Sequence, residues 1–224
     1  RLGFDLGYNR FDYDYEGLYS LSNDRSEETF TLTGYFRIAP KTRLLAEYNH
    51  GRIRYDKKPT PSKNSNSDET NFGVTGIITP KLTGTVKTGY KSQNYQTAED
   101  WESATFSGDL DYKFSERTNL YFSFKRTTKE TTYITEDYLE TNEFSFSGNH
   151  RLAFNPRLTL TFDGAFKYDK YPKQETERQD DIYGVGVGLK YKFRRWLEFS
   201  LNYNYTKRES NVVFNYDKNE VTLK

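Results

Sequence analysis

Hydrophobic and polar residues alternate along most of this chain. In residues 144–154 the even positions hold Phe, Gly, His or Leu, while most of the odd positions hold Ser, Asn or Arg. After Asn155-Pro156 the alternation resumes and runs through residues 158–168. Successive side chains of a β-strand point to opposite faces, so the pattern predicts strands with one apolar and one polar face. Each run has about ten residues or more, which is the length of a tilted strand that crosses a bilayer.

The same alternation predicts about twelve strands over the whole chain. A twelfth strand begins near Val221. The cores of the other eleven are residues 2–8, 30–38, 44–48, 72–78, 82–90, 106–114, 120–124, 144–154, 158–168, 183–193 and 197–205. Five connections are tight turns, and six are long and polar, such as 56–68, 127–141 and 169–181. Short turns that alternate with long loops are typical of outer-membrane barrels, in which the turns are periplasmic and the loops extracellular. We therefore predict an all-β fold: one antiparallel, up-and-down transmembrane β-barrel domain over residues 1–224.

Alternation alone does not say which face points inward, because a soluble barrel would pack its apolar face inside. Two features favour an apolar face toward lipid. Aromatic residues gather near both strand ends, as in the interfacial girdles of membrane barrels. About eight strands already suffice for a packed interior, so twelve would not fit a solid core. The predicted girdle comprises Phe114, Phe154, Phe193 and Trp196 on the turn side, and Tyr48, Tyr90, Tyr168 and Tyr205 on the loop side. A soluble β-sandwich or an extended repeat is the alternative, and it would not need detergent.

The polar face is then expected to line the lumen. It carries charges of both signs and three glycines: Arg37, Glu47, Lys87, Asp109, Lys113, Lys125, Arg151, Asp163, Lys167, Gly184, Gly186, Gly188, Lys190 and Glu198. The three glycines either hollow one sector of the lumen or allow the strand to curve. Glycines on the apolar face, Gly76 with Gly84 and Gly148 with Gly164, are equidistant from a proline, and we expect each pair to lie opposite across a hairpin.

Composition narrows the possible functions. Aromatic residues make up 17% of the chain, the hydrophobic fraction is 34%, and Cys is absent, which excludes disulfides, thiolate metal sites and a catalytic thiol. The net charge of +1 argues against nucleic acid as a partner. No run of 18 apolar residues exists that could form a transmembrane helix. A bare strand edge is costly in lipid, so we expect either a few residues missing at both ends or further strands outside this sequence.

Candidate catalytic chemistry is sparse. His50 lies at a strand end and His150 on the apolar register, and neither has the neighbours of a catalytic or haem site. The acidic pairs Glu136-Asp137 and Asp180-Asp181 fit solvated loops better than calcium binding or catalysis. We therefore expect no catalytic, cofactor or metal site, and no enzyme.

Three stretches carry a resemblance to a known family: KTGYKSQNY (87–95), GDLDYKFSERTNLYFSFKR (108–126) and GLKYKFRRWLEFSLNYNY (188–205). They resemble the bacterial outer-membrane barrels grouped as putative β-barrel porin type 2, some of which sit in exopolysaccharide-export systems. The resemblance implies an outer-membrane channel, pore or exit barrel of an export system in a Gram-negative envelope. Its partners would be outer-membrane lipid and either periplasmic export components or a protein held in the lumen. The chain is also similar to barrels that sheath multihaem cytochromes, which implies a structural sheath or anchor as the alternative.

Overall fold

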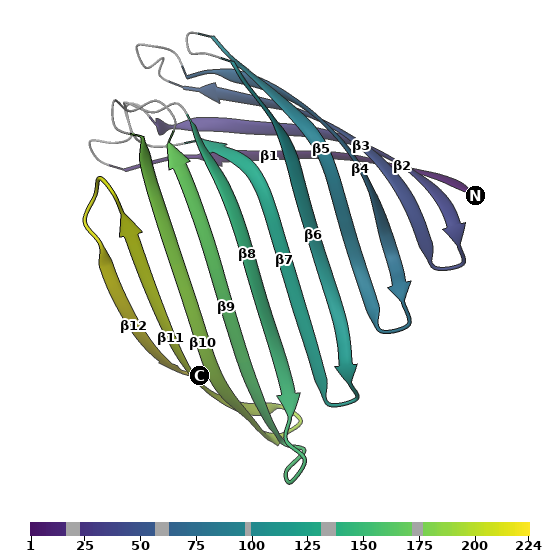
Figure 1. Cartoon of the computed structure of the whole chain (residues 1–224), viewed down its shortest axis with the longest axis vertical. Coiled ribbons are helices and arrows are strands. Elements are labelled where there is room, and N and C mark those ends of the chain that lie inside the picture. Colours follow the sequence, from purple (N-terminus) through teal and green to yellow (C-terminus); the bar gives the residue numbers. More distant parts are fainter. Residues whose placement is uncertain (17–22, 57–62, 97–99, 131–137, 172–176) are drawn as a thin grey trace. The chain divides into compact units, whose positions relative to one another are not determined.

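The computed structural model describes residues 1–16, 23–56, 63–96, 100–130, 138–171 and 177–224 (Figure 1). These residues form twelve β-strands in one sheet, whose order follows the sequence from β1 to β12. The strands are β1 (Leu2–Tyr13), β2 (Arg25–Ala39), β3 (Thr42–Tyr55), β4 (Ser65–Thr79), β5 (Leu82–Tyr95), β6 (Trp101–Ser115), β7 (Thr118–Glu130), β8 (Tyr138–Arg151), β9 (Leu158–Tyr171), β10 (Arg178–Arg194), β11 (Leu197–Ser210) and β12 (Tyr216–Leu223). The prediction of an all-β, antiparallel, up-and-down fold is confirmed.

Short and long connections alternate as the sequence predicts. Four turn-side connections have two residues each, at 40–41, 80–81, 116–117 and 195–196, and the fifth spans 152–157. The strands are longer on the loop side than the alternation predicts. β7 continues to Glu130, β9 to Tyr171, and β10 already begins at Arg178. Parts of the predicted long loops are therefore strand. Within the described parts of the chain, no helix is long and apolar enough to span a membrane.

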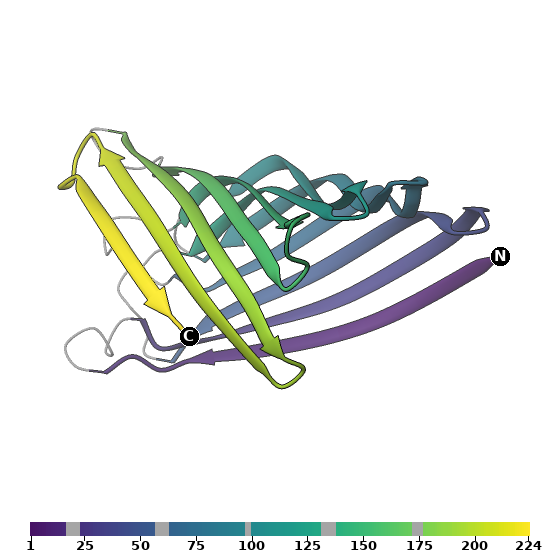
Figure 2. The same ribbon diagram turned by 90° about the horizontal axis from the view of Figure 1, so that it is seen from below.

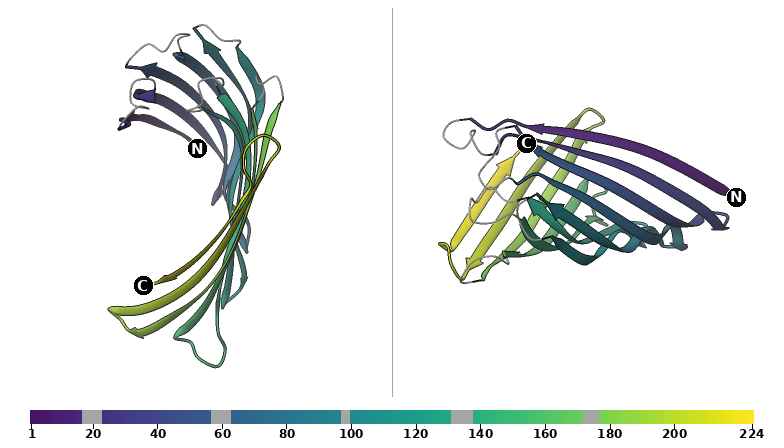
Figure 3. Two further views of the ribbon diagram at one scale, coloured as in Figure 1. Left: turned by 90° about the vertical axis from the view of Figure 1, so that its left-hand side faces the viewer. Right: turned by 90° about the horizontal axis from the view of Figure 1, so that it is seen from above.

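The chain divides into two compact units. The first contains Arg1–Gly76 and Thr85–Phe106, and the second contains Ile77–Gly84, Ser107–Glu130 and Tyr138–Lys224. In the first unit β1, β2 and β3 lie side by side in antiparallel pairing (Figure 2). In the second unit β9, β10, β11 and β12 do the same (Figure 3). β2 and β10 each have a register shift at their turn-side end, as a β-bulge produces.

The apolar face of each unit is exposed. Leu2 in the first unit is 72% exposed, and Val185 and Leu201 in the second are 56% and 53% exposed. All described strands belong to one sheet, and no second layer of described strands or helices covers this face. Soluble proteins rarely expose such continuous apolar surface, whereas a strand that faces lipid needs it.

Phenylalanines cover the glycines of the apolar face in the second unit. Gly148 pairs with Phe162, and Gly164 pairs with Phe146, across β8 and β9. A Cβ atom on either glycine would collide with the ring of its partner, so each ring lies over its glycine. Gly108 is covered in the same way by Phe124. Aromatic packing over a strand glycine restores the side-chain contacts that the glycine lacks.

The predicted pairing of Gly148 with Gly164 is therefore wrong. The hairpin is centred on Asn155 rather than on Pro156, because Arg151 pairs with Thr159. The Asn155 carbonyl accepts a hydrogen bond from the Leu158 amide at 2.9 Å, which fixes this centre. A shift of one residue in the centre moves every cross-strand partner by two positions. The result is two Phe–Gly contacts in place of the predicted Gly–Gly pair.

An Arg on the apolar face should destabilise the protein, while the same change on the polar face should not. Leu201→Arg is expected to cost about 2–4 kcal/mol, because a guanidinium near the bilayer midplane loses its hydration. Asn202→Arg, one residue along β11 on the other face, is the matched control. Urea unfolding in lipid vesicles would measure both variants. Equal losses would contradict the assignment of faces.

Candidate functional site: the polar face of the sheet

The residues predicted to line the lumen share one face of the sheet within each unit. In the first unit Glu47 pairs with Thr33, and Arg37 lies on the same face of β2 as Thr33. In the second unit Arg151, Thr159 and Lys190 form one row across β8, β9 and β10. The remaining members of the second unit follow the same alternation: Asp109, Lys113, Lys125, Asp163, Lys167, Gly184, Gly186, Gly188 and Glu198. That this face lines an aqueous interior stays a prediction.

A carboxylate at the centre of the first unit gathers polar groups from three strands. Glu47 Oε1 accepts hydrogen bonds from Lys87 Nζ at 2.8 Å, Asn49 Nδ2 at 3.0 Å and Asn71 Nδ2 at 3.2 Å. The side chains of Glu47 and Lys87 are 14% and 26% exposed, so water screens this pair only partly. The charge of Lys87 is thereby balanced within the protein.

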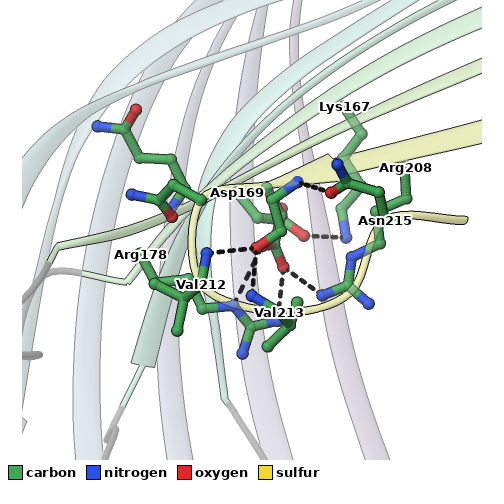
Figure 4. A network of polar contacts seen from close by, with 11 residues as sticks. Lys167, Asp169, Arg178, Arg208, Val212, Val213 and Asn215 are labelled. Atoms are coloured by element: carbon green, nitrogen blue, oxygen red, sulfur yellow. Dashed lines mark hydrogen bonds and ion pairs between the residues drawn. The ribbon is translucent and has the colours of Figure 1, made fainter.

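A second network braces the loop side of the second unit, where Arg178 and Arg208 both donate to Asp180 (Figure 4). Arg178 donates to Asp180 through Nε at 3.1 Å and through Nη2 at 2.6 Å, and Arg208 Nη2 donates to it at 2.6 Å. The side chains of Arg178 and Asp180 are only 1% and 2% exposed. The guanidinium of Arg178 also lies 4.3 Å from the ring centroid of Tyr171. Two-pronged arginine–carboxylate bonds at low exposure are among the stronger polar interactions in proteins.

The same network holds the connection between β11 and β12. The Ser210 hydroxyl accepts hydrogen bonds from the amides of Val212 and Val213 at 3.3 Å and 3.1 Å (Figure 4). Asn215 Oδ1 accepts from the Ser210 amide at 2.7 Å. The first unit has a comparable brace, in which Arg25 lies 4.6 Å from the ring of Tyr13 and donates to Glu27. These contacts tie the loop-side ends of neighbouring strands together.

The sequence interpretation of Asp180 as a solvated loop residue is wrong. Asp180 lies in β10 on the polar face, where only 1% of the residue is exposed. β9 and β10 both extend toward the loops beyond the last alternating apolar residues. Tyr171 of β9 and Arg178 and Asp180 of β10 occupy polar-face positions in this extension. The period of two carries on through these residues and could have revealed them. Glu136 and Asp137 lie outside the described residues.

A pocket of about 570 Å³ opens on the turn side of the polar face in the second unit. It brings together Arg151, Asp163, Lys190 and Glu198 of the predicted lumen set. The sequence reasoning did not predict the other polar members of its lining, which are Tyr121, Ser147, Asn149, Arg157, Thr159, Thr161 and Lys192. Strand register explains the grouping, because β8 to β11 present their polar side chains in aligned rows.

The three glycines of β10 do not leave one continuous hollow. A Cβ atom on Gly186 would lie 2.5 Å from Asp163 Oδ1 and 2.6 Å from Asn204 Oδ1, so these side chains already occupy the space. Asn202 and Thr161 lean over Gly188 in the same way. Only Gly184 has room, with its nearest atom, the Ala165 Cβ, at 3.8 Å. The hollow predicted for all three positions is thus limited to one.

Neither histidine stands alone. His50 Nδ1 lies 2.9 Å from Asp68 Oδ1, and His150 Nδ1 lies 2.8 Å from Thr118 Oγ1. Both partners come from the neighbouring strand, so each histidine links two adjacent strands of the sheet. In the described parts of the chain, no three acidic, histidine or cysteine residues are grouped so that they could hold a metal ion.

Comparison with models of known protein families identifies the family of the protein. The family described as putative beta-barrel porin 2 matches residues 1–224. The chain belongs to this family. A search of curated proteins found no match. As a member of the porin 2 family, the protein resides in the bacterial outer membrane.

One solved structure has a similar fold. The siderophore receptor PirA from Pseudomonas aeruginosa superposes with a TM-score of 0.56 at 10% identity, over 99% of this chain and 41% of the receptor. The chain thus spans less than half of that receptor. A chain from a study of the in-meso crystallization of membrane proteins is 12% identical over 100% of this chain and 84% of its own length. Its TM-score of 0.35 is too low to support the fold.

That the aromatic residues at the strand ends form two interfacial girdles stays a prediction. On the turn side Phe154 and Trp196 are 80% and 78% exposed. On the loop side the hydroxyls of Tyr48, Tyr90 and Tyr205 each donate to a carboxylate of the next strand. Tyr48 donates to Asp68 at 2.5 Å, and Tyr205 donates to Asp217 at 3.2 Å. Rings that are apolar on one side and hydrogen-bonded at the tip suit the membrane interface.

Removing the carboxylate of Asp180 should weaken the loop-side brace. Asp180→Ala leaves Arg178 and Arg208 without their shared partner, and we expect a loss of about 3–5 kcal/mol in the free energy of unfolding. Asp181→Ala, the neighbouring carboxylate on the other face, is the control and should change little. Heat-dependent gel mobility and urea unfolding would measure both. If both variants unfolded like the wild type, Asp180 would not hold the loop-side strand ends.

Proposed function

We propose that this barrel is a channel whose polar face lines a water-filled passage across the outer membrane. One observation supports the proposal most directly: the two faces of the sheet differ in chemistry along the middle of the strands. One face exposes large apolar side chains. The other carries Lys, Arg, Asp and Glu at alternate positions of neighbouring strands. Ionisable side chains are costly in lipid and stable beside water, so a wet interior accounts for both faces.

Within this proposal the barrel serves as a pore or as the exit barrel of an export system, with an exopolysaccharide as cargo. The family match is the support for a porin-like, non-enzymatic role. Both histidines and the Asp180 carboxylate are engaged in contacts between neighbouring strands. Periplasmic export components are the expected partners on the turn side.

A structural sheath that holds a partner protein is the second candidate. The observation that favours it is the loop-side brace, which places buried ionic side chains across part of the polar face. A barrel that encloses another protein would conduct few ions by itself. It would also keep that partner through purification, so the two candidates can be separated by experiment.

Conductance of the full-length protein in a planar bilayer tests the proposal. A channel should open in discrete ohmic steps. Gly184→Trp should reduce the step, because the open space beside Gly184 on the polar face would be filled. Val185→Trp, on the apolar face of the same strand, is the control and should leave the step unchanged. A silent bilayer, together with a protein that co-purifies in fixed ratio, would contradict the channel and favour the sheath.

A further inference from the structure

The two ends of the polar face in the second unit differ in how their charges are balanced. Toward the loops, most cations have an acidic partner. The ion pairs found there on the polar face are Lys129–Glu143, Lys167–Asp169, Arg178–Asp180, Arg208–Asp180 and Lys218–Glu220. Toward the turns, in the part of the chain that the structure describes, no ion pair involves Arg151, Arg157, Lys190 or Lys192. These four cations therefore keep their charge available to a ligand.

All four unpaired cations line the turn-side pocket. Arg151 and Lys190 stand in one row, separated by Thr159 on β9. Arg157 and Lys192 are joined through the backbone, since the Lys192 amide donates to the Arg157 carbonyl at 2.9 Å. Two strands of a sheet are about 5 Å apart, so Arg151 and Lys190 lie about 10 Å from each other along the row. A ligand with the length of one or two sugar rings spans this distance and can contact both.

The remaining lining fits a ligand that carries hydroxyl groups. Asp163 and Glu198 offer carboxylate acceptors, and Asn149, Thr159 and Thr161 offer groups that donate and accept. Tyr121 is 41% exposed and presents an aromatic ring at the edge of the same pocket. A halide or sulfate ion has no hydroxyl group to donate to these acceptors. A hydroxylated organic anion uses both kinds of group.

Further cations surround the pocket and extend its field. Arg194 and Arg195 line an adjoining hollow together with Arg157 and Trp196. Clustered charge of one sign attracts oppositely charged ligands and raises their local concentration. The pocket volume of about 570 Å³ falls within the range of about 300–1,000 Å³ that is usual for small-molecule sites.

We propose that this pocket is a binding site for an acidic saccharide, a short stretch of sugar rings that bear carboxylates. Arg151 and Lys190 contact the carboxylates, Asp163 and Glu198 accept hydrogen bonds from sugar hydroxyls, and Tyr121 packs against a ring. The inference deepens the proposed channel by giving its passage a substrate class. Binding to the pocket does not itself require that the passage conducts.

Titration calorimetry on the full-length protein in detergent micelles tests the site with digalacturonate as the probe. Digalacturonate should bind, and the affinity should fall as salt is raised, because screening weakens attraction between exposed charges. The double variant Arg151→Gln/Lys190→Gln should lose about tenfold or more in affinity, as expected when charged hydrogen bonds are removed. Lys125→Gln lies on the same face outside this pocket and should bind like the wild type. Unchanged heat-dependent gel mobility would show that the variants are folded.

Three results would overturn the proposal. The first is binding of maltose, which lacks the carboxylates, as tightly as digalacturonate. The second is equally tight binding of citrate, which lacks the sugar rings. The third is a loss of affinity in Lys125→Gln as large as in the double variant. The first result removes the role of the cations, the second that of the hydroxyl acceptors, and the third the location. Conductance is measured separately. Binding without conductance would support the saccharide site and contradict the channel. Conductance without binding would contradict the saccharide site alone.

Discussion

Lipid offers no hydrogen-bond partner to a peptide group, and this constraint governs the structure. Each strand that crosses the hydrocarbon must pair its amides and carbonyls with another strand. The described strands meet this demand by pairing in sequence order, each with the strand before and after it where both are present. Because pairing is continuous, side chains are forced into two faces with a period of two. The division into an apolar and a polar face then decides where charge can be placed.

Register is the second consequence of the same constraint. The turn at residues 152–157 sets which residues of β8 and β9 face each other. With Asn155 at its centre, Phe162 lies over Gly148 and Phe146 over Gly164. On the other face this register aligns Arg151 with Thr159. One short turn thus determines both the packing of the lipid side and the row of polar groups that lines the turn-side pocket.

The parts of the fold that could be predicted from the sequence are those that depend on alternation. The number of strands and the division of residues such as Leu201 and Asn202 between two faces follow from a period of two. The centre of the hairpin at Asn155 could not be predicted, because it depends on backbone hydrogen bonds within the turn. The loop-side strand ends were also missed, since apolar alternation stops before Arg178 and Asp180 while the pairing continues. Which cations remain unpaired depends on side-chain geometry across three or four strands, which the sequence does not display.

The central claim is that the polar face meets water and the apolar face meets lipid, and thiol labelling tests it directly. The chain has no cysteine, so single variants at successive positions of β11 carry unique labels. A thiol reacts with a water-soluble maleimide as its thiolate, a form that water supports and lipid suppresses. In lipid vesicles, Asn202→Cys and Asn204→Cys should react, and Leu201→Cys and Tyr203→Cys should not. Reaction at the odd positions and protection of the even ones would contradict the account.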